Sequence, residues 1–478
     1  MALDAESEAI GSLLLDRGAL TAEQLDAAED LAEDWNVSLV KVLLSRRWLT
    51  TQTLYREIAF YHGLTLVDLI EDRADDDLIR QYDPVVMNQF MTVPIGRAED
   101  GTLTVATSRP GPRTLLHIRE VYGTGVTIVV ASHFDVSWQL QRAFREKHSH
   151  EAVFALAELD PDMSAQNVVT PPQILVIYLL GSALLLGLAF SPVVTLIVLN
   201  VFLTIFYTGN FLFKALLVWL GGAAQETSSR AIAAEASLLR DEDLPIYTVL
   251  VPMFREPEVL PILAQALRNL DYPLAKLDIK IVLEEGDHET IDAARKLDLE
   301  GVFEIIRVPA SHPQTKPKAC NFALRYAQGD FLVIFDAEDK PEPDQLKKVI
   351  AAFNQSAPNT ACIQCRLNYY NARENWLTRM FTLDYSLWFD LMLPGLERLG
   401  VPIPLGGTSN HFRMDVLREL NAWDPFNVTE DADLGIRLTQ KGYRVGVIDS
   451  TTFEEANVSI PNWVRQRSRW IKGYMQTF

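Results

Sequence analysis

The stretch Phe331-Leu-Val-Ile-Phe-Asp336-Ala-Glu338-Asp339 decides how the second half of the chain folds. Its five apolar residues predict a strand that is buried on both faces, and its acidic residues mark the end of that strand. Similar short apolar runs precede it at residues 247–251, 279–283 and 303–308, and residues 259–270 have a helical pattern. This alternation of strands and helices predicts an α/β fold with a mostly parallel sheet.

Ligands bind at the carboxyl ends of the strands in such sheets, which makes the residues after each strand the candidate site. Asp336, Glu338 and Asp339 follow one strand directly. Clustered carboxylates suit a hard divalent cation, because such ions prefer oxygen ligands and would neutralise a diphosphate. The sequence therefore predicts a Mg²⁺ or Mn²⁺ site at this end of the sheet.

Further polar segments accompany these carboxylates along the chain. Glu284 and Glu285 form an acidic turn after the strand at residues 279–283, and Lys318 lies in a basic turn suited to phosphate oxygens. Three later segments are also polar: Gly406-Gly-Thr-Ser-Asn-His-Phe-Arg413, Thr429-Glu-Asp431 and Gln466-Arg-Ser-Arg-Trp470.

Composition excludes two classes of protein. The formal net charge is -20, whereas phosphate contacts of a nucleic-acid binder need dense Lys and Arg, so nucleic acid is not an expected partner. The three cysteines, Cys320, Cys362 and Cys365, are too few for a disulfide framework. Cys362 and Cys365 have the spacing of metal ligands, but residues 361–368 alternate as a strand does, which favours a structural role over zinc or redox chemistry.

Two long apolar runs lie in the middle of the chain. Residues 174–190 and 193–213 are uncharged, and only Ser191-Pro192 separates them. Each is about as long as a bilayer core requires, roughly 20 helical residues. Lys214 and Arg230 follow the second run, which favours a cytoplasmic carboxyl-terminal side. We therefore expect a membrane hairpin flanked by cytoplasmic domains, with a buried hairpin of a soluble protein as the alternative.

The amino-terminal region contains an internal repeat, in which Leu13-Leu-Leu-Asp-Arg-Gly18-Ala-Leu-Thr21 pairs with Val42-Leu-Leu-Ser-Arg-Arg47-Trp-Leu-Thr50. In both copies a helix ends at a turn, and Thr21 or Thr50 is expected to cap the next helix. Strand-like runs at residues 91–96, 101–107 and 126–131 alternate with helical segments at 76–82 and 114–122. These features predict a small α+β domain.

The ordered motifs of residues 244–475 resemble glycosyltransferase family 2, and more closely its membrane-embedded branch, which is similar to cellulose and hyaluronan synthases. The sequence departs from the family pattern twice, because Glu284 and Glu285 stand where Asp is usual and Glu338 holds the second acidic position of Asp-x-Asp. The resemblance implies a GT-A-type catalytic domain. The motifs that carry the resemblance are Val251-Pro252 with Arg255-Glu256, Glu284-Glu285-Gly286, Lys318-Ala-Cys-Asn321, Asp336-x-Glu338, Thr429-Glu-Asp431 and Gln466-x-x-Arg-Trp470.

This resemblance also implies an inverting transfer from a nucleotide sugar, expected to be UDP-linked, to a growing glycan. Asp431 would be the general base, with Glu430 beside it in the catalytic motif. Gln466 and Trp470 would bind the acceptor. The donor would contact Pro252, Glu256, Glu284, Glu285, Lys318, Asp336 and Arg469, and the metal would bind Asp336, Glu338 and Asp339.

The motif at Gln466 to Trp470 favours a processive synthase of an extracellular polysaccharide at the bacterial inner membrane. The alternatives are a single-addition transferase that uses a lipid carrier and a catalytically silent receptor, against which Asp431 argues. Residues 376–399 are expected to lie along the membrane lipid as surface helices. Two spans cannot easily enclose a polar polymer, so we also expect further membrane helices beyond residue 478 or a pore or outer-membrane export partner.

Residues 10–145 resemble the amino-terminal domain of type II secretion and pilus ATPases, through Ile10-Gly11-x-Leu-Leu14-x-x-x-Gly18 and Tyr61-His-Gly-Leu. Some members bind cyclic di-GMP through two motifs that open with Arg-Leu-Gly. Ala9 stands at the Arg, and Val40 and Arg47 stand where glycines would fall, so weak or absent binding is expected.

The resemblance of the amino-terminal domain implies a regulatory role, and a docking module without ligand is the alternative. The acidic amino terminus lacks a basic-plus-apolar signal, so it is expected in the cytoplasm. The expected organisation is an amino-terminal domain at 1–150, a linker at 151–172, two transmembrane helices at 173–220, a linker at 221–243 and the catalytic domain at 244–478.

Overall fold

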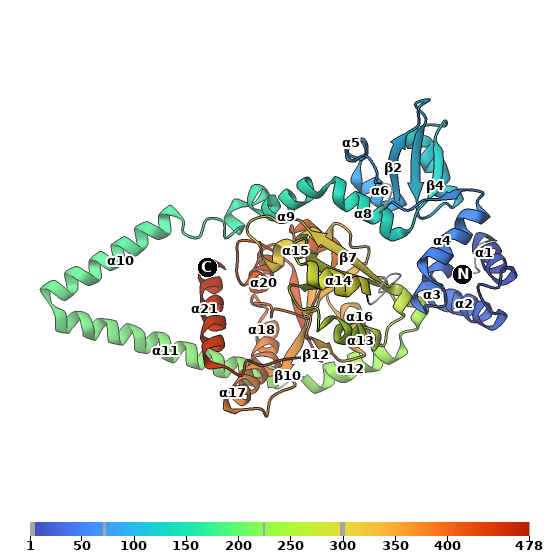
Figure 1. Ribbon diagram of the computed structural model, residues 1–478. Coiled ribbons are helices and arrows are strands. Elements are labelled where there is room, and N and C mark those ends of the chain that lie inside the picture. Colours follow the sequence, from blue (N-terminus) through green and yellow to red (C-terminus); the bar gives the residue numbers. More distant parts are fainter. Residues whose placement is uncertain (1–4, 70–72, 223–224, 297–301, 478) are drawn as a thin grey trace. The chain divides into compact units, whose positions relative to one another are not determined.

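The computed structural model describes residues 5–69, 73–222, 225–296 and 302–477 (Figure 1). The chain forms two compact units. Unit 1 contains residues 1–152 and 239–337, and unit 2 contains residues 153–238 and 338–478. Each unit is therefore assembled from two segments that are distant in the sequence.

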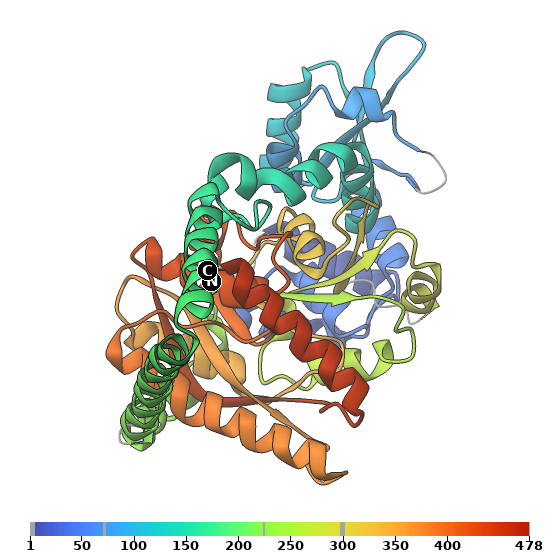
Figure 2. The ribbon, with the colours of Figure 1, turned by 90° about the vertical axis from the view of Figure 1, so that its left-hand side faces the viewer.

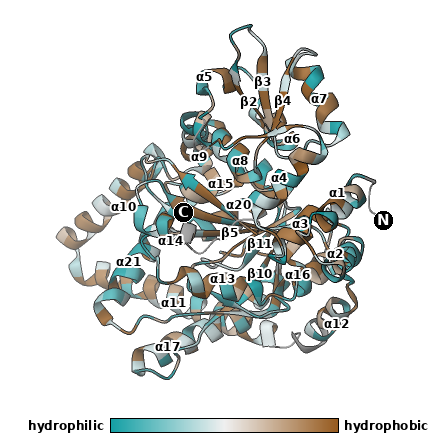
Figure 3. Cartoon of the chain, turned by 45° about the vertical axis from the view of Figure 1, so that its right-hand side comes forward, coloured by the Kyte–Doolittle hydropathy of each residue, from teal (hydrophilic) through white to brown (hydrophobic). Residues whose placement is uncertain are grey.

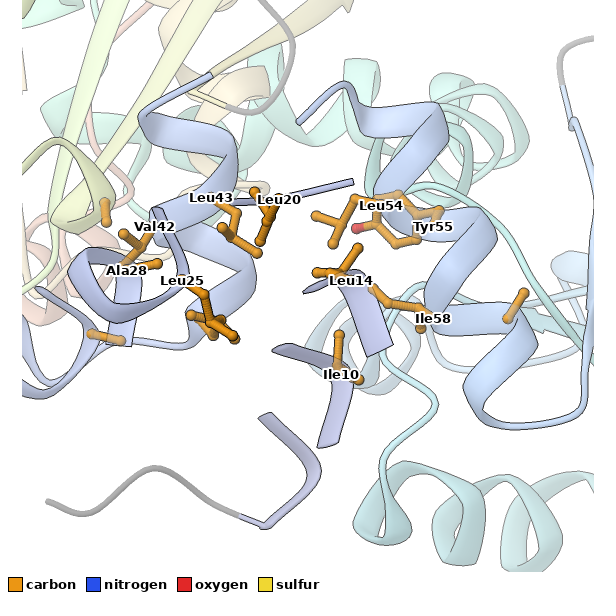
Figure 4. Close-up of a cluster of buried hydrophobic side chains, with 14 of the residues drawn as sticks. Ile10, Leu14, Leu20, Leu25, Ala28, Val42, Leu43, Leu54, Tyr55 and Ile58 are labelled. Atoms are coloured by element: carbon orange, nitrogen blue, oxygen red, sulfur yellow. The ribbon is translucent and has the colours of Figure 1, made fainter. Parts of the chain in front are cut away.

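Unit 1 begins with the helical repeat, whose helices are α1 (Ala5–Asp16), α2 (Ala22–Trp35), α3 (Leu39–Ser45) and α4 (Thr51–Tyr61). Both expected caps are confirmed, because the Thr21 hydroxyl accepts the Gln24 N–H at 3.2 Å and the Thr50 hydroxyl accepts the Thr53 N–H at 3.2 Å. The apolar faces of these helices meet in a buried core, to which Ile10, Leu14, Leu25, Val42, Leu54 and Ile58 contribute (Figure 4).

The two copies of the repeat turn in the same way although their residues differ. Gly18 follows α1 with a φ of 67°, and Arg47 lies at the equivalent turn after α3 with a φ of 54°. A left-handed backbone is readily available to glycine but costs a residue with a Cβ about 1–2 kcal/mol. Arg47 therefore keeps the geometry of a glycine turn without the glycine.

A four-stranded sheet with the order β1-β4-β3-β2 follows the helical repeat. Its strands are β1 (Thr65–Leu66), β2 (Thr92–Arg97), β3 (Leu103–Thr107) and β4 (Thr127–Val130). It packs with α5 (Asp76–Ile79), α6 (Pro84–Phe90), α7 (Pro112–Tyr122) and α8 (His133–Ala143). The predicted strands and helices are confirmed, except that α5 ends three residues before the expected end at Tyr82.

The second segment of unit 1 holds four parallel strands in the order β7-β6-β5-β8. Val249 of β5 pairs with Ile279 and Val333, so apolar residues adjoin across the sheet, whose hydropathy is shown in Figure 3. All four predicted strands are confirmed as β5 (Tyr247–Met253), β6 (Leu277–Glu284), β7 (Phe303–Val308) and β8 (Phe331–Ile334). Helices α13 (Leu260–Arg268), α14 (His288–Lys296) and α15 (Lys316–Leu324) accompany them.

The segments expected to be linkers contain helices. Helix α9 (Arg145–Leu159) extends beyond residue 151, and α12 (Gln225–Leu238) follows the second apolar helix.

Unit 2 contains the two long apolar helices, α10 (Pro171–Phe190) and α11 (Pro192–Gly222). Both are long and apolar enough to cross a membrane, and none of the most apolar window of either is buried by the protein. The end of α11 lies against α18 (Leu393–Leu399) at very close range, because a Cβ on Gly395 would lie 2.3 Å from the Leu217 carbonyl oxygen. This contact requires a glycine.

The strands of unit 2 have the order β11-β10-β12-β9. β10 (Thr360–Tyr369) pairs in parallel with β12 (Arg444–Glu454), whereas β11 (Asn410–Arg413) and β9 (Lys340–Pro341) pair antiparallel with their neighbours. The predicted strand at residues 361–368 is confirmed, and Cys362 and Cys365 are buried in it. Burial raises the pKa of both thiols, as a structural role requires.

The expected polar loop at residues 406–413 is half strand, because residues 410–412 pair with β10 as part of β11. Unit 2 also contains α16 (Gln345–Gln355), α17 (Trp376–Tyr385), the π-helix η4 (Ser386–Met392), α19 (Met414–Glu419), α20 (Glu430–Gln440) and α21 (Ile460–Thr477). Arg467 of α21 (red in Figure 2) pairs with Asp384 of α17 at 2.6 Å.

Candidate active site

The carboxyl ends of β5, β6 and β8 lie at one edge of the sheet, since the three strands are parallel. Pro252 lies near the end of β5, and the next turn is held by the turn after β6, because the Asp287 carboxylate accepts the Arg255 N–H at 2.5 Å. The Glu256 N–H donates to the Thr290 hydroxyl at 3.2 Å. Arg255 has a left-handed φ of 59°. Asp287 and Thr290 therefore fix the turn that presents Glu256, a role that the sequence did not indicate.

Lys318 and Glu284 form a buried ion pair. The Lys318 ammonium lies 2.9 Å from Oε1 and 3.1 Å from Oε2 of Glu284, and it also donates to the Pro309 carbonyl at 3.0 Å. Burial raises the pKa of Glu284, while the hydrogen bond and charge of Lys318 oppose that rise. Lys318 thus ties the start of α15 to the end of β6.

Asp336, directly after β8, pairs with the Lys316 ammonium at 2.5 Å. Both side chains keep partial access to solvent, with exposed fractions of 37% for Asp336 and 28% for Lys316. Residues 316–321, which were expected to form a basic turn, lie in helix α15, and the first turn of this helix delivers two ammonium groups to two different strand ends. Lys316 is close to Lys318 in the sequence, but only the fold brings it to Asp336.

Glu338 and Asp339 belong to unit 2 and differ in environment. Glu338 is exposed, whereas Asp339 is buried and accepts a hydrogen bond from the Thr408 hydroxyl at 2.5 Å. The Thr408 contact joins Asp339 to the loop at residues 406–409. Within the ranges that the structure describes, no three His, Cys, Asp or Glu side chains form a group that could hold a metal by themselves.

The expected base, Asp431, lies in the first turn of α20 and is buried. The Trp423 indole N–H donates to its Oδ1 at 3.1 Å, and Trp423 is itself fully buried. Glu430 precedes Asp431 and is half-buried. A carboxylate at a helix N-terminus is stabilised by the helix dipole.

The turn that precedes Asp431 is held by a residue that sequence reasoning missed. Asp424, fully buried, accepts the Phe426 N–H at 3.1 Å, the Ala165 N–H at 2.5 Å and the Ser164 hydroxyl at 3.2 Å. Charge-assisted hydrogen bonds of this kind are stronger than neutral ones. The segment before α10 therefore supports the loop that leads to Asp431, a contact that no local sequence pattern indicates.

Helix α21 presents the last expected motif. The Gln466 side chain accepts a hydrogen bond from Asn457 at 3.1 Å, and Trp470 is half-buried with the Arg467 guanidinium 4.4 Å from its ring centre. Arg469 is exposed. The helix is fixed against the turn before α20 at Gly473, where a Cβ would lie 2.1 Å from the Thr429 hydroxyl oxygen. The structure therefore brings α21 and the Thr429 turn into contact.

This architecture is a mixed α/β fold, and two family models match parts of the chain. Residues 331–478 match the model of glycosyl transferase family group 2, and residues 62–150 match the model of the MshEN domain. The chain therefore carries a glycosyltransferase family 2 domain and an MshEN domain. The first match contains Asp336, Asp431 and Trp470, while the second leaves out the helical repeat before residue 62.

Curated relatives are glycosyltransferases by name. The chain is 27% identical over 240 residues to the beta-monoglucosyldiacylglycerol synthase of Trichormus variabilis. The aligned region covers 49% of this chain and 50% of that protein. It is 26% identical to the probable glycosyltransferase YdaM of Bacillus subtilis, over 48% of this chain and 56% of that protein. Glucomannan 4-beta-mannosyltransferase 7 of Arabidopsis thaliana is 25% identical, over 48% and 42%. The chain spans about half the length of the curated relatives it matches.

Solved structures with similarity include the mannosyltransferase PcManGT from Pyrobaculum calidifontis in complex with GDP-Man and Mn²⁺. It has 21% identity and a TM-score of 0.40, over 55% of this chain and 74% of that chain. The structure of MshE with cdg has 24% identity and a TM-score of 0.26, over 28% of this chain and 97% of that chain.

Proposed function

We propose that this chain transfers a sugar from a nucleoside-diphosphate donor to an acceptor hydroxyl, with inversion at the anomeric carbon, at the surface of the bacterial inner membrane. The observation that carries the proposal is Asp431, a buried carboxylate that the Trp423 indole holds at 3.1 Å within the glycosyltransferase family 2 domain.

Asp431 would act as the general base. A hydroxyl is a poor nucleophile until a base within hydrogen-bond reach takes its proton as the new bond forms. In an inverting transfer the acceptor oxygen bonds to the anomeric carbon while the bond to the diphosphate breaks on the opposite face. The proton then resides on Asp431, and the leaving group is a nucleoside diphosphate. Trp423 would keep the carboxylate oriented during this step.

The diphosphate would be held by Asp336 and Glu338 through a divalent cation. Mg²⁺ and similar ions commonly take one or two protein carboxylates and complete their shell with substrate phosphates and water, so two acidic residues with solvent access fit. Such an ion supplies charge neutralisation at the leaving group. Lys316, which pairs with Asp336 at 2.5 Å, would turn to the phosphates when the ion binds. Asp339 and Arg469 stay predicted ligands of the metal and the diphosphate.

The membrane surface is proposed from apolar residues on three parts of unit 2. Helices α10 and α11 are long and apolar enough to span a bilayer. Apolar side chains also stay exposed on shorter helices, at 63% for Leu383 in α17 and at 61% and 71% for Ile471 and Met475 in α21. A helix whose apolar face is not covered by protein is suited to lie in the bilayer interface. The domains on either side of the hairpin would then face the cytoplasm.

The product that we propose first is an exported polysaccharide, made by processive synthesis. Its support is α21, which carries Trp470 and contacts the Thr429 turn at Gly473. Such a product would need a pore or export partner. A second candidate is a single addition to a lipid acceptor, which the relative named beta-monoglucosyldiacylglycerol synthase favours.

The amino-terminal domain would regulate rather than catalyse. Cyclic di-GMP is a candidate ligand, because a solved relative is named as MshE with cdg. We propose that binding is weak or absent, since the Arg47 side chain stands at the left-handed turn where Gly18 stands in the first copy.

The proposed activity is tested with the full chain in membranes and a panel of labelled UDP- and GDP-sugars. We expect one donor to give labelled product that the Asp431→Asn variant does not give. Label in an insoluble polymer supports processive synthesis, and label in the chloroform phase supports transfer to lipid. No product from any donor with folded protein would contradict the proposal.

A further inference from the structure

The amino-terminal domain packs directly on the edge of the parallel sheet in unit 1. The Ser137 hydroxyl of α8 donates to Glu304 of β7, and the Gln141 side chain accepts the Arg307 N–H at 3.3 Å. The Arg307 guanidinium lies 4.1 Å from the Trp138 ring centre. Glu304 also pairs with the buried Lys280 of β6. The amino-terminal domain therefore belongs to the same unit as the strands whose carboxyl ends carry the candidate donor-binding residues.

Helix α9 continues this contact onto α15 and the turn after it. The His148 ring Nδ1 lies 2.9 Å from the Tyr326 hydroxyl, and both side chains are buried. The Asn321 side chain donates to the Ala152 carbonyl at 3.0 Å. Glu151 pairs with Arg325 at 3.0 Å. Three polar contacts thus join one face of α9 to the segment at residues 321–326.

Helix α15, which contains Asn321, also carries two lysines that lie at the carboxyl ends of the strands. Lys316 and Lys318 stand in the first turn of α15 and pair with Asp336 and Glu284, whereas Tyr326 lies two residues after the helix ends. A helix transmits displacement along its axis, because its backbone is hydrogen-bonded throughout and rises about 1.5 Å per residue. A shift of α15 at its carboxyl end would therefore move the first turn, and with it Lys316, relative to the strand ends.

We propose that His148 is a positioning residue for the donor site, and that α9 of the amino-terminal domain sets donor affinity by fixing α15 through Tyr326. This inference rests on the proposed function, since it assigns the donor phosphates to Lys316. His148 acts by holding the helix that presents this lysine.

The environment of His148 suits a permanent contact. Burial lowers its pKa to about 4, with the charges of Arg325 and Lys147 acting in the same direction, so the ring is neutral at physiological pH. Phe144 stacks on the ring at 5.7 Å, and Phe322 of α15 lies edge-on at 6.4 Å. The exposed ion pair of Arg145 and Glu285 at 3.4 Å contributes little to the stability of this contact, because solvent screens the two charges.

The test compares His148→Leu and Tyr326→Phe in the full chain, with the double variant. We expect each to raise the KM for the donor about five- to tenfold while kcat and the acceptor KM stay within about twofold. The double variant should match the single ones, since both break one contact. His148→Gln, which keeps a polar partner for the hydroxyl, should restore most of the affinity.

A matched control is His62→Leu, because His62 pairs with Glu6 at 2.9 Å inside the helical repeat and does not bond to α15. An equal rise in donor KM in His62→Leu, or additive effects in the double variant, would overturn the proposal. Calorimetric affinities for UDP and GDP keep the test independent of turnover. If no sugar is transferred by the wild type but nucleotide affinity still falls in His148→Leu, the proposed reaction fails and the positioning role stands. Unchanged nucleotide affinity in folded Tyr326→Phe sinks the positioning role.

Discussion

The indole N–H of Trp423 donates to Oδ1 of Asp431 at 3.1 Å, and both side chains are buried. Trp423 is further fixed by Phe412, whose ring meets it edge-on at 5.8 Å. A donor aimed at a carboxylate stabilises its charged form and restricts its rotation. This pair links the tightly packed β11 region to the first turn of α20, where the proposed base stands.

Replacing Trp423 by Phe removes this donor while keeping an aromatic ring. We expect kcat to fall about tenfold or more, because a hydrogen bond to a charged group contributes about 1.5–3 kcal/mol. Donor affinity should stay the same. Steady-state kinetics measure both quantities. Phe412→Leu serves as the control, since it loosens the packing around Trp423 but keeps the hydrogen bond. An equal loss of kcat in that control would show that packing, not the bond, matters.

Removal of divalent cations should stop transfer, and Mg²⁺ or Mn²⁺ should restore it. Asp336→Ala should weaken the affinity for nucleotide in the presence of metal. In this variant the nucleotide affinities with and without metal should therefore be nearly equal. Calorimetry with UDP or GDP, with and without metal, measures this effect. Wild-type turnover that persists at full rate in excess chelator would contradict a metal held by Asp336 and Glu338.

The Arg47→Gly variant should be more stable than the wild type. The φ of 54° at Arg47 is strained for any residue with a Cβ. Glycine relieves that strain but increases the entropy of the unfolded chain, which offsets part of the gain. The net gain should be about 0.5–1 kcal/mol in the free energy of unfolding. Gly18→Ala, at the equivalent turn with a φ of 67°, should lose stability by at least as much. Urea unfolding of the two variants checks the opposite signs.

The buried ring of His411 should make stability depend on pH. Burial lowers its pKa from 6.5 to about 3, so below pH 6.5 the unfolded chain binds a proton that the folded chain does not. Stability at this site is therefore fully present above pH 6.5 and is lost as pH falls toward about 3. At pH 5 the loss would reach about 2 kcal/mol as an upper value.

The His411→Gln variant should lose less stability than the wild type between pH 7.5 and pH 5. Glutamine cannot be protonated there and can still meet Gln345, which the ring contacts at 3.3 Å. Urea midpoints at the two pH values give the comparison. Parallel pH curves for both proteins would show that His411 is not the titrating group.

Much of the fold could be predicted because apolar periodicity is a local signal. The strands β5 to β8 have short apolar runs between turns, and α10 and α11 have long uncharged ones. The caps at Thr21 and Thr50 were also predictable, since a cap depends on residues within one turn. Domain membership could not be obtained in this way. Unit 1 joins residues 1–152 to residues 239–337 across contacts between distant segments.

The candidate site could likewise be predicted only in part. Asp336 and Asp431 stand in motifs that can be read from the sequence, but their partners come from elsewhere in the chain. Lys316 is 20 residues from Asp336, and Ser164 is 260 residues from Asp424. Sequence patterns indicate which residues have suitable chemistry. Only the packed structure shows which of them are paired, and Lys318 illustrates this because its ammonium is already bound to Glu284.

The most direct test of the account is the Asp431→Asn variant, assayed for both turnover and donor binding. The amide is nearly the same size and can still meet the Trp423 indole through its oxygen, but it cannot take the proton of the acceptor hydroxyl. We predict a loss in kcat of about 10²–10⁴-fold with the dissociation constant of the nucleotide within about twofold of the wild type. Turnover above about a tenth of the wild-type rate would contradict a general base at Asp431.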